Sequence, residues 1–279
     1  MTNRFPKEGI VVAHRYSLPD NLKPKKQVIV CIKPDTRKHP FAQLHITDNH
    51  SDNLNRSKIW PSKFIPHWTQ IDLKPRDDKR CQFCNVAFVG DPKNNLKEEF
   101  RHNQWAITLK KNNFNWKIIN RDKWNDFSNI DAIVAVRPDF FDRRGSNKSL
   151  QKLYNAWTAG VPIIIGNGPE YQTEKKSDLD FIKANNSKEV LAALKRLRKD
   201  IKFRQQIIEN GKQRAQEFSP EQTVEKWINF LHNVAVPYYQ KWQKKSSAYK
   251  KGYFLIRLLL FKFEGLKMRV FPDKYKYKP

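Results

Sequence analysis

The chain has 279 residues, with 54 Lys and Arg against 28 Asp and Glu, a net charge of +26 and 13% aromatic residues. This aromatic content supplies enough apolar surface for a folded core, which excludes a largely disordered chain, and the length allows two domains. No apolar run approaches the ~20 residues that a membrane span needs, and no signal-peptide core follows Met1. We therefore expect a cytoplasmic protein. Three cysteines (Cys31, Cys81 and Cys84) are too few for a disulfide framework and suit a reducing compartment.

The excess positive charge fits nucleic acid, an anionic membrane surface or phosphorylated small molecules. Residues 236–279 hold ten Lys and two Arg against Glu264 and Asp273, so this tail supplies +10 of the total. The remaining charge is spread thinly, without an arginine-rich block or an aromatic-plus-basic RNA-binding pattern. We therefore do not expect a nucleic-acid partner.

The first 80 residues read as a short β-rich or α/β region. Segments 10–14, 27–32 and 43–47 are rich in β-branched residues, prolines separate them, and no long amphipathic helix lies between. The charged segment 73–80 contains Pro75 and is typical of a linker. We place a domain boundary after it, at 80/81.

Residues 81–235 show the alternation of a doubly wound parallel sheet. Continuous apolar strands are expected at 85–90, 116–120, 131–136, 162–166 and 181–184. Helices are expected between or after them at 96–109, 149–159, 187–198 and 201–217, and from Pro220 onward with a buried face of Val224, Trp227, Ile228 and Leu231. Such strands are buried on both faces, and ligands bind at their carboxyl ends. The loops after Val89, Val136 and Ile165 therefore become candidate site walls.

The segment Lys148 to Gly166, KSLQKLYNAWTAGVPIIIG, resembles the donor-site helix and following strand of GT-B glycosyltransferases. In that pattern a helix ending in Ala-Gly-x-Pro leads into a strand, and the likeness extends over 84–235. The resemblance implies a Rossmann-like domain at 81–235 that binds a nucleoside-diphosphate sugar, and a reduced acceptor-side domain at 1–80. It implies sugar transfer to a glycan or lipid acceptor, with the nucleotide sugar as co-substrate and no other cofactor.

Two features depart from the family. Its usual pair of glutamates falls on Asn147 and Asn155; the second binds the donor ribose, and Asn155 retains both donor and acceptor capacity for this. Only about 80 residues precede the linker, so either the acceptor domain is reduced or the chain lacks its beginning. These departures leave an alternative open, a non-catalytic nucleotide-binding subunit that acts with a partner chain.

Stabilising a departing diphosphate without a metal requires cations and backbone N–H groups. The candidates follow the expected strands or open the donor helix: Gly90, Lys93, Arg137, Lys148, Lys152 and Gly166. Lys148 and Lys152 are four residues apart, which predicts both ammonium groups on one helix face. A solvated basic face and ordinary turn glycines are the alternatives, because no G-x-G-x-x-G motif occurs.

Metal and general-base candidates are sparse. Asp178 and Asp180 form an Asp-x-Asp pair, but they precede apolar residues like a capped turn, and Cys81 and Cys84 lack a second pair of ligands. We therefore expect metal-independent chemistry. His14 and His67 follow expected strands and are the candidate bases for an inverting reaction, with a structural role as the alternative for each.

The tail at 247–270 combines an apolar run, 253–263, with flanking lysines and arginines. This pattern is typical of a helix lying on an anionic membrane, which would make the protein peripheral at the inner face of the membrane. The other interpretation is a helix that crosses back and packs on the N-terminal domain. The two are not exclusive.

Overall fold

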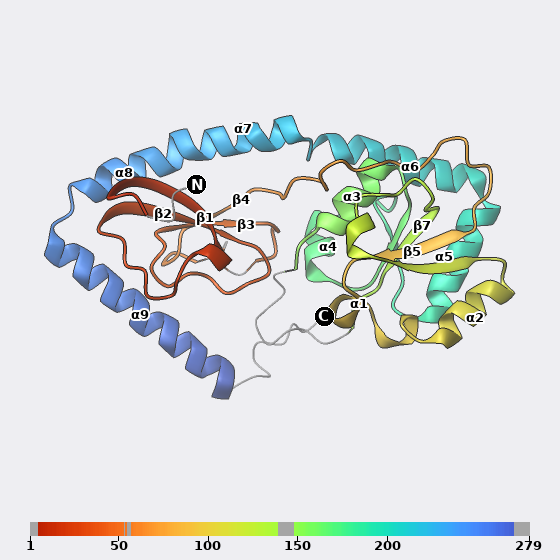
Figure 1. Ribbon diagram of the computed structural model, residues 1–279, viewed down its shortest axis with the longest axis horizontal. Coiled ribbons are helices and arrows are strands. Elements are labelled where there is room, and N and C mark those ends of the chain that lie inside the picture. Colours follow the sequence, from red (N-terminus) through yellow and green to blue (C-terminus); the bar gives the residue numbers. More distant parts are fainter. Residues whose placement is uncertain (1–4, 53, 55–56, 139–147, 271–279) are drawn as a thin grey trace. The chain divides into compact units, whose positions relative to one another are not determined.

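The computed structural model describes the chain except for residues 1–4, 53, 55–56, 139–147 and 271–279. It divides into two compact units: unit 1 comprises 1–66, 141–149 and 223–279, and unit 2 comprises 67–140 and 150–222. Each has its own parallel sheet (Figure 1), which confirms the predicted α/β class. The division falls at 66/67 instead of the expected 80/81, because segment 73–80 is bonded to the sheet of unit 2. It falls at 222/223 instead of 235/236, because the C-terminal helices pack with the N-terminal strands.

Unit 1 contains a four-stranded sheet in the order β1-β2-β3-β4, with every pair parallel. Its strands are β1 (Glu8–His14), β2 (Lys26–Lys33), β3 (Leu44–Thr47) and β4 (Ser62–Phe64). Strand β2 is buried on both faces, since Val28 and Val30 belong to one apolar cluster and Ile29 and Cys31 to another. The three expected strands are confirmed, and β4 is an addition.

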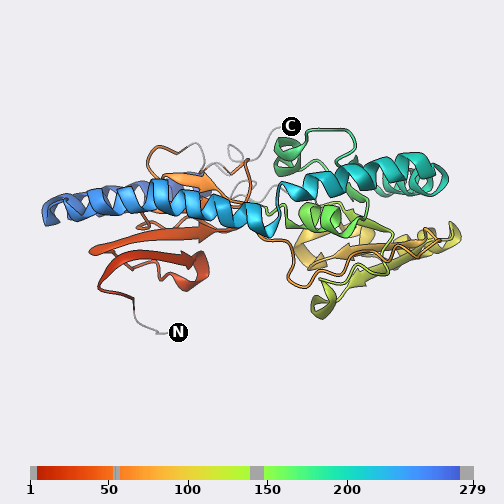
Figure 2. The same cartoon turned by 90° about the horizontal axis from the view of Figure 1, so that it is seen from above.

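The C-terminal helices cover one face of this sheet. They are α7 (Pro220–Phe230), a π turn (Leu231–Ala235), α8 (Val236–Gln243) and α9 (Ser247–Val270). Pro237 lies just after the π turn; a proline lacks an N–H and its ring clashes with the carbonyl four residues earlier, which explains the irregular turn at that point. Phe230, Trp242 and Phe254 share the apolar cluster of Val28 and Val30. Figure 2 shows the C-terminal helices, in blue, lying along the red and orange strands of unit 1.

This packing confirms the interpretation that the last helix returns to the N-terminal strands. The expected buried face of α7 was wrong in part: Val224 and Ile228 are exposed, whereas Thr223 and Phe230 are buried. Within the described residues, no helix has the length and apolar composition needed to cross a bilayer.

Unit 2 is the expected doubly wound domain, with a five-stranded parallel sheet in the order β6-β5-β7-β8-β9. The strands are β5 (Asn85–Val89), β6 (Asn115–Ile119), β7 (Ala132–Ala135), β8 (Ile163–Ile165) and β9 (Ile182–Lys183). The helices are α1 (Pro92–Asn95), α2 (Asn103–Lys111), α3 (Gln151–Ala159), α4 (Pro169–Glu174), α5 (Ser187–Lys199) and α6 (Ile201–Gln216). Side chains of α2 and α5 join one core cluster and those of α3 and α4 the other, so helices cover both faces of the sheet.

The expected linker at 73–80 belongs to unit 2. The backbone of Lys74 pairs with Asn125 and Phe127, and the guanidinium groups of Arg76 and Arg80 bind the carboxylate of Asp131. That carboxylate is fully buried, and it also accepts backbone N–H bonds from Cys84 and Asn85. A buried carboxylate needs such partners, so this charged segment is fixed to the sheet and is not a spacer.

Candidate functional site

The sheet of unit 2 has a topological switch point between β5 and β7. The chain runs from β5 outward to β6 on one side, returns to β7 on the other side, and continues to β8 and β9. In open parallel sheets, ligands bind outside the carboxyl ends of the strands at this point. Gly90 directly follows β5 and Arg137 comes two residues after β7, so two predicted site residues flank the switch point.

Lys152 reaches the same place from the first turn of α3. A Cβ built on Gly90 would lie 2.8 Å from the Lys152 Nζ, and Gly90 has a φ of +140°. Only glycine combines this backbone conformation with room for the ammonium group. The Lys152 Nζ also lies 5.5 Å from the centre of the Phe88 ring. The structure therefore brings Gly90 and Lys152 together at the end of β5.

Arg137 is anchored by a carboxylate that the sequence analysis did not identify. Its guanidinium forms an ion pair with Glu170, a buried residue in the first turn of α4, and lies 5.2 Å from the centre of the Tyr171 ring. Glu170 lies five residues after Ile165, the last residue of β8. The Gly-x-Gly-Pro-Glu run at 166–170 was the available signal. The pairing fixes the direction of Arg137 and leaves a cation and a carboxylate side by side.

Gly166 and Lys93, two further predicted site residues, follow strands β8 and β5 of this sheet. A Cβ on Gly166 would lie 3.4 Å from Val136 and 3.7 Å from the Asn185 Oδ1. The same Oδ1 accepts the backbone N–H of Asn167 at 3.2 Å, so the loops after β8 and β9 are tied together. Lys93 lies in α1 just after Gly90, and its side chain is exposed.

Lys148 is not on the α3 face that carries Lys152. The helix begins at Gln151, three residues later than Lys148, so the i, i+4 expectation was wrong. Lys148 belongs to unit 1, where its Nζ lies 3.5 Å from a carboxylate oxygen of Asp35 and its carbonyl accepts a bond from Asn49. Asn147, the other family position, lies outside the described residues.

Asn155 is buried in α3, with 6% of its surface exposed. Its Oδ1 accepts the backbone N–H of Gln70 at 2.9 Å. This amide oxygen therefore fixes the segment that opens unit 2. Binding of a donor ribose by Asn155 stays a prediction. It would use the hydrogen-bonding capacity of the amide group that the Gln70 N–H does not occupy.

A second group of polar residues lies at the carboxyl ends of β2 and β3 in unit 1. Lys33 and Asp52 form a buried ion pair, and Asp48, 4% exposed, lies directly after β3. Burial raises the pKa of Asp48 to about 6, against the opposing effects of the Ser149 hydroxyl and the Lys33 ammonium. A carboxyl with this pKa changes protonation state near neutral pH, which suits proton transfer. Asp48 had no sequence signal, because its shift arises from packing.

The two predicted bases lie in different surroundings. His14 ends β1 in unit 1, where its Nδ1 accepts the backbone N–H of Tyr16 at 3.4 Å and its ring lies 5.1 Å from the Tyr16 ring. This is a capping role. His67 is half-buried at the start of unit 2. Neither assignment as a base is tested by these contacts.

Asp178 and Asp180 have separate environments. Asp178 is exposed and pairs with Lys175, whereas Asp180 is buried and binds Arg214, which also pairs with buried Glu174. Cys81 and Cys84 are free thiols. In the part of the chain that the structure describes, no cluster of His, Cys, Asp and Glu has three members placed to hold a metal ion.

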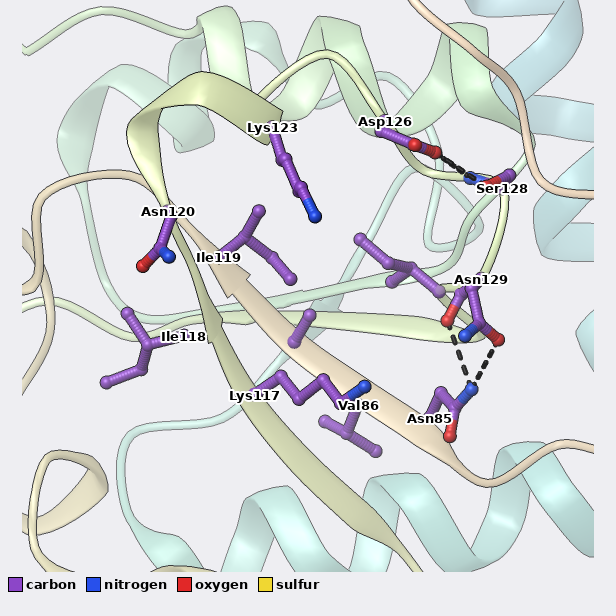
Figure 3. Close-up of a pocket in the computed structure, with 12 residues that line it drawn as sticks. Asn85, Val86, Lys117, Ile118, Ile119, Asn120, Lys123, Asp126, Ser128 and Asn129 are labelled. Atoms are coloured by element: carbon purple, nitrogen blue, oxygen red, sulfur yellow. Dashed lines mark hydrogen bonds between the residues drawn. The ribbon is translucent and has the colours of Figure 1, made fainter.

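A separate open pocket of about 480 Å³ lies over β5 and β6 (Figure 3). Lys117 and Lys123 reach across it, and the Asn85 amide donates to Asn129 at its amino-end rim. Segment 120–130, which crosses from β6 toward β7, contains the short 3₁₀ turn Arg121–Lys123 and a single β-bridge from Asp126 to Lys74, and no α-helix. The pocket lies beside this crossover segment. Its lining does not include Gly90, Arg137 or Lys152, the residues at the switch point.

Comparison with known proteins identifies the fold class. No family model and no curated protein match the chain. Solved structures do: TarM, at 11% identity with a TM-score of 0.57, covers 79% of this chain. Sucrose-phosphate synthase from Thermosynechococcus elongatus, at 12% identity with a TM-score of 0.57, covers 82%.

A third neighbour is Anabaena HepE, solved in complex with UDP and glucose, at 11% identity with a TM-score of 0.54 over 75% of the chain. This chain spans 54% of TarM, 74% of the synthase and 72% of HepE. The neighbours are GT-B proteins, so the protein has the GT-B fold, as the resemblance of segment 148–166 implied. At these identities the likeness concerns the fold alone.

Proposed function

We propose that the protein is a glycosyltransferase that uses a nucleoside-diphosphate sugar and binds its diphosphate at the switch point of unit 2. The observation that carries this proposal is the convergence of Lys152 with Gly90 at the end of β5, with Arg137 following the adjacent strand β7. Two cations and a glycine that exposes the backbone suit a diphosphate. HepE, a GT-B neighbour, was solved with UDP and glucose.

In the proposed reaction, Lys152 and Arg137 stabilise the negative charge that grows on the departing diphosphate. No metal takes part, so transfer continues in EDTA. Glu170 orients Arg137 through their ion pair. Acceptor recognition, of a glycan or a lipid, belongs to unit 1.

The test of the donor site is a thermal-shift panel of UDP, GDP, ADP and TDP, followed by titration of the diphosphate that stabilises the protein. A specific ligand raises stability by RT ln(1 + [L]/Kd). Lys152→Ala is expected to weaken diphosphate binding at least tenfold and to leave binding of the free nucleoside unchanged. Lys195→Ala, which removes an exposed cation from α5, is the matched control. Equal losses for nucleoside and diphosphate would refute the role of Lys152.

The non-catalytic alternative, a nucleotide-binding subunit that acts with a partner chain, rests on Asn155 in place of the family's glutamate. Slow release of free sugar from the matching nucleotide sugar separates the two proposals. Release that Lys152→Ala abolishes supports the transferase. Tight diphosphate binding without any release, with or without candidate acceptors, supports the subunit.

A further inference from the structure

Helix α9 has one buried face and one exposed apolar face. Phe254 and Arg257 are buried, and Phe261 is half-buried with Arg37 over its ring. On the outside lie six large apolar side chains, each 53–63% exposed: Leu255, Ile256, Leu259, Phe263, Leu266 and Val270. We call these six residues the outer stripe. The apolar sequence run predicted at 253–263 is thus divided between the core and the solvent.

The outer stripe is continuous. At about 100° per residue, its six members fall within an arc of about 100°, directly opposite the arc of Phe254, Arg257 and Phe261. From Leu255 to Val270 it extends about 22 Å along the helix. An exposed apolar surface of this kind marks an interaction site.

Cations border the outer stripe on both sides. Lys251, Lys262 and Arg269 lie along one edge and Lys267 along the other, with the Lys267 Nζ 4.5 Å from the centre of the Phe263 ring. In the described part of the chain none of these four cations forms an ion pair. The only acidic residue of α9, Glu264, points away from the stripe and pairs with Lys38.

We propose that the outer stripe of α9 binds the surface of an anionic lipid bilayer. The apolar side chains enter the boundary between headgroups and acyl chains, and the bordering cations meet lipid phosphates. The long stems of Lys and Arg allow this arrangement, since their charged ends reach the headgroups while the stems stay beside the apolar surface. A second copy of the chain fits less well, because two facing stripes would bring the same cations together.

This inference does not depend on the donor site, because vesicle binding and nucleotide binding are separate measurements. The full chain is sedimented with vesicles of phosphatidylcholine alone, or with phosphatidylglycerol added, at 0.1 M and 1 M salt. We expect binding to the anionic vesicles at 0.1 M, at least tenfold weaker binding to the neutral ones, and release at 1 M, where the Debye length falls from ~10 Å to ~3 Å.

Two pairs of variants locate the contact. Leu259→Asp is expected to lower the partition coefficient at least tenfold, whereas Ile228→Asp, at a residue 60% exposed on α7, leaves it unchanged. Lys262→Gln with Arg269→Gln is expected to move release to lower salt. Lys188→Gln with Lys195→Gln removes the same charge at the same seven-residue spacing on α5 and is expected to have no effect.

All of these side chains are exposed, so the melting temperature of each variant should match that of the parent. Equal binding to neutral and anionic vesicles, or binding to neither, would overturn the proposal. So would dimerisation in sedimentation velocity that Leu259→Asp abolishes while vesicles remain unbound. In that case a second copy covers the stripe.

Discussion

Replacing Asp48 with Asn should stabilise the protein above pH 6. Burial raises the pKa of Asp48 from 3.8 to about 6, so the folded state holds this proton more tightly than the unfolded state does. The favourable contribution of Asp48 is therefore complete below pH 3.8 and is lost as the pH rises through about 6. At pH 8 the wild-type protein keeps a buried charge that the neutral amide of the variant does not carry.

The size of the effect follows from the shift. About two pKa units correspond to about 3 kcal/mol at 1.36 kcal/mol per unit, an upper value because an amide also needs hydrogen bonds. Asp52→Asn is the matched control. Asp52 is equally buried but pairs with Lys33, so its loss leaves a buried ammonium without a counter-charge and should lower the free energy of unfolding by about 3 kcal/mol.

Urea unfolding of the wild type and both variants at pH 4 and pH 8 measures these differences. Asp48→Asn should raise the midpoint at pH 8 and leave it nearly unchanged at pH 4. Destabilisation by Asp48→Asn at pH 8 would show that the carboxylate is well solvated or well paired, and the assignment of a raised pKa would fail. If Asp48 also transfers a proton in the reaction, the stabilised variant should lose activity.

Three further predictions concern unit 2. Gly90→Ala should weaken diphosphate binding at least tenfold by displacing the Lys152 ammonium, and calorimetry showing an unchanged Kd would contradict this geometry. Asn155→Ala should lower the free energy of unfolding by about 1 to 3 kcal/mol, because the Gln70 N–H loses its acceptor. An unchanged unfolding curve would refute this structural role. Weaker nucleotide binding by the same variant would support contact of Asn155 with the donor ribose. Arg214→Met should lower the free energy of unfolding by about 3 to 5 kcal/mol, because Glu174 and Asp180 stay buried without their cation. A decrease below about 1 kcal/mol, measured by urea unfolding, would refute this role of Arg214.

The sequence alone predicted most of the strands and the fold class. Runs such as 132–136 and 163–165 are apolar without alternation, which is typical of a strand buried on both faces. The same pattern placed Gly90 and Arg137 after their strands, and therefore at the edge where ligands bind. These features are local, because strand ends and glycines can be read from a few neighbouring residues.

Tertiary structure decided which of these residues meet. Lys148 and Lys152 are close in sequence, but the helix begins between them, so only Lys152 reaches Gly90. Glu170 and Asp48 carried no strong signal, because an ion pair with Arg137 and a shifted pKa depend on residues distant in the chain.

The same holds for the faces of α9. Its sequence is apolar nearly all round, and periodicity cannot tell which apolar residues lie on the sheet and which face solvent. Packing against β2 buries Phe254 and leaves Leu259 exposed. A hydrophobic pattern indicates that burial of a side chain is favourable, whereas the position of the neighbouring elements determines which surface buries it.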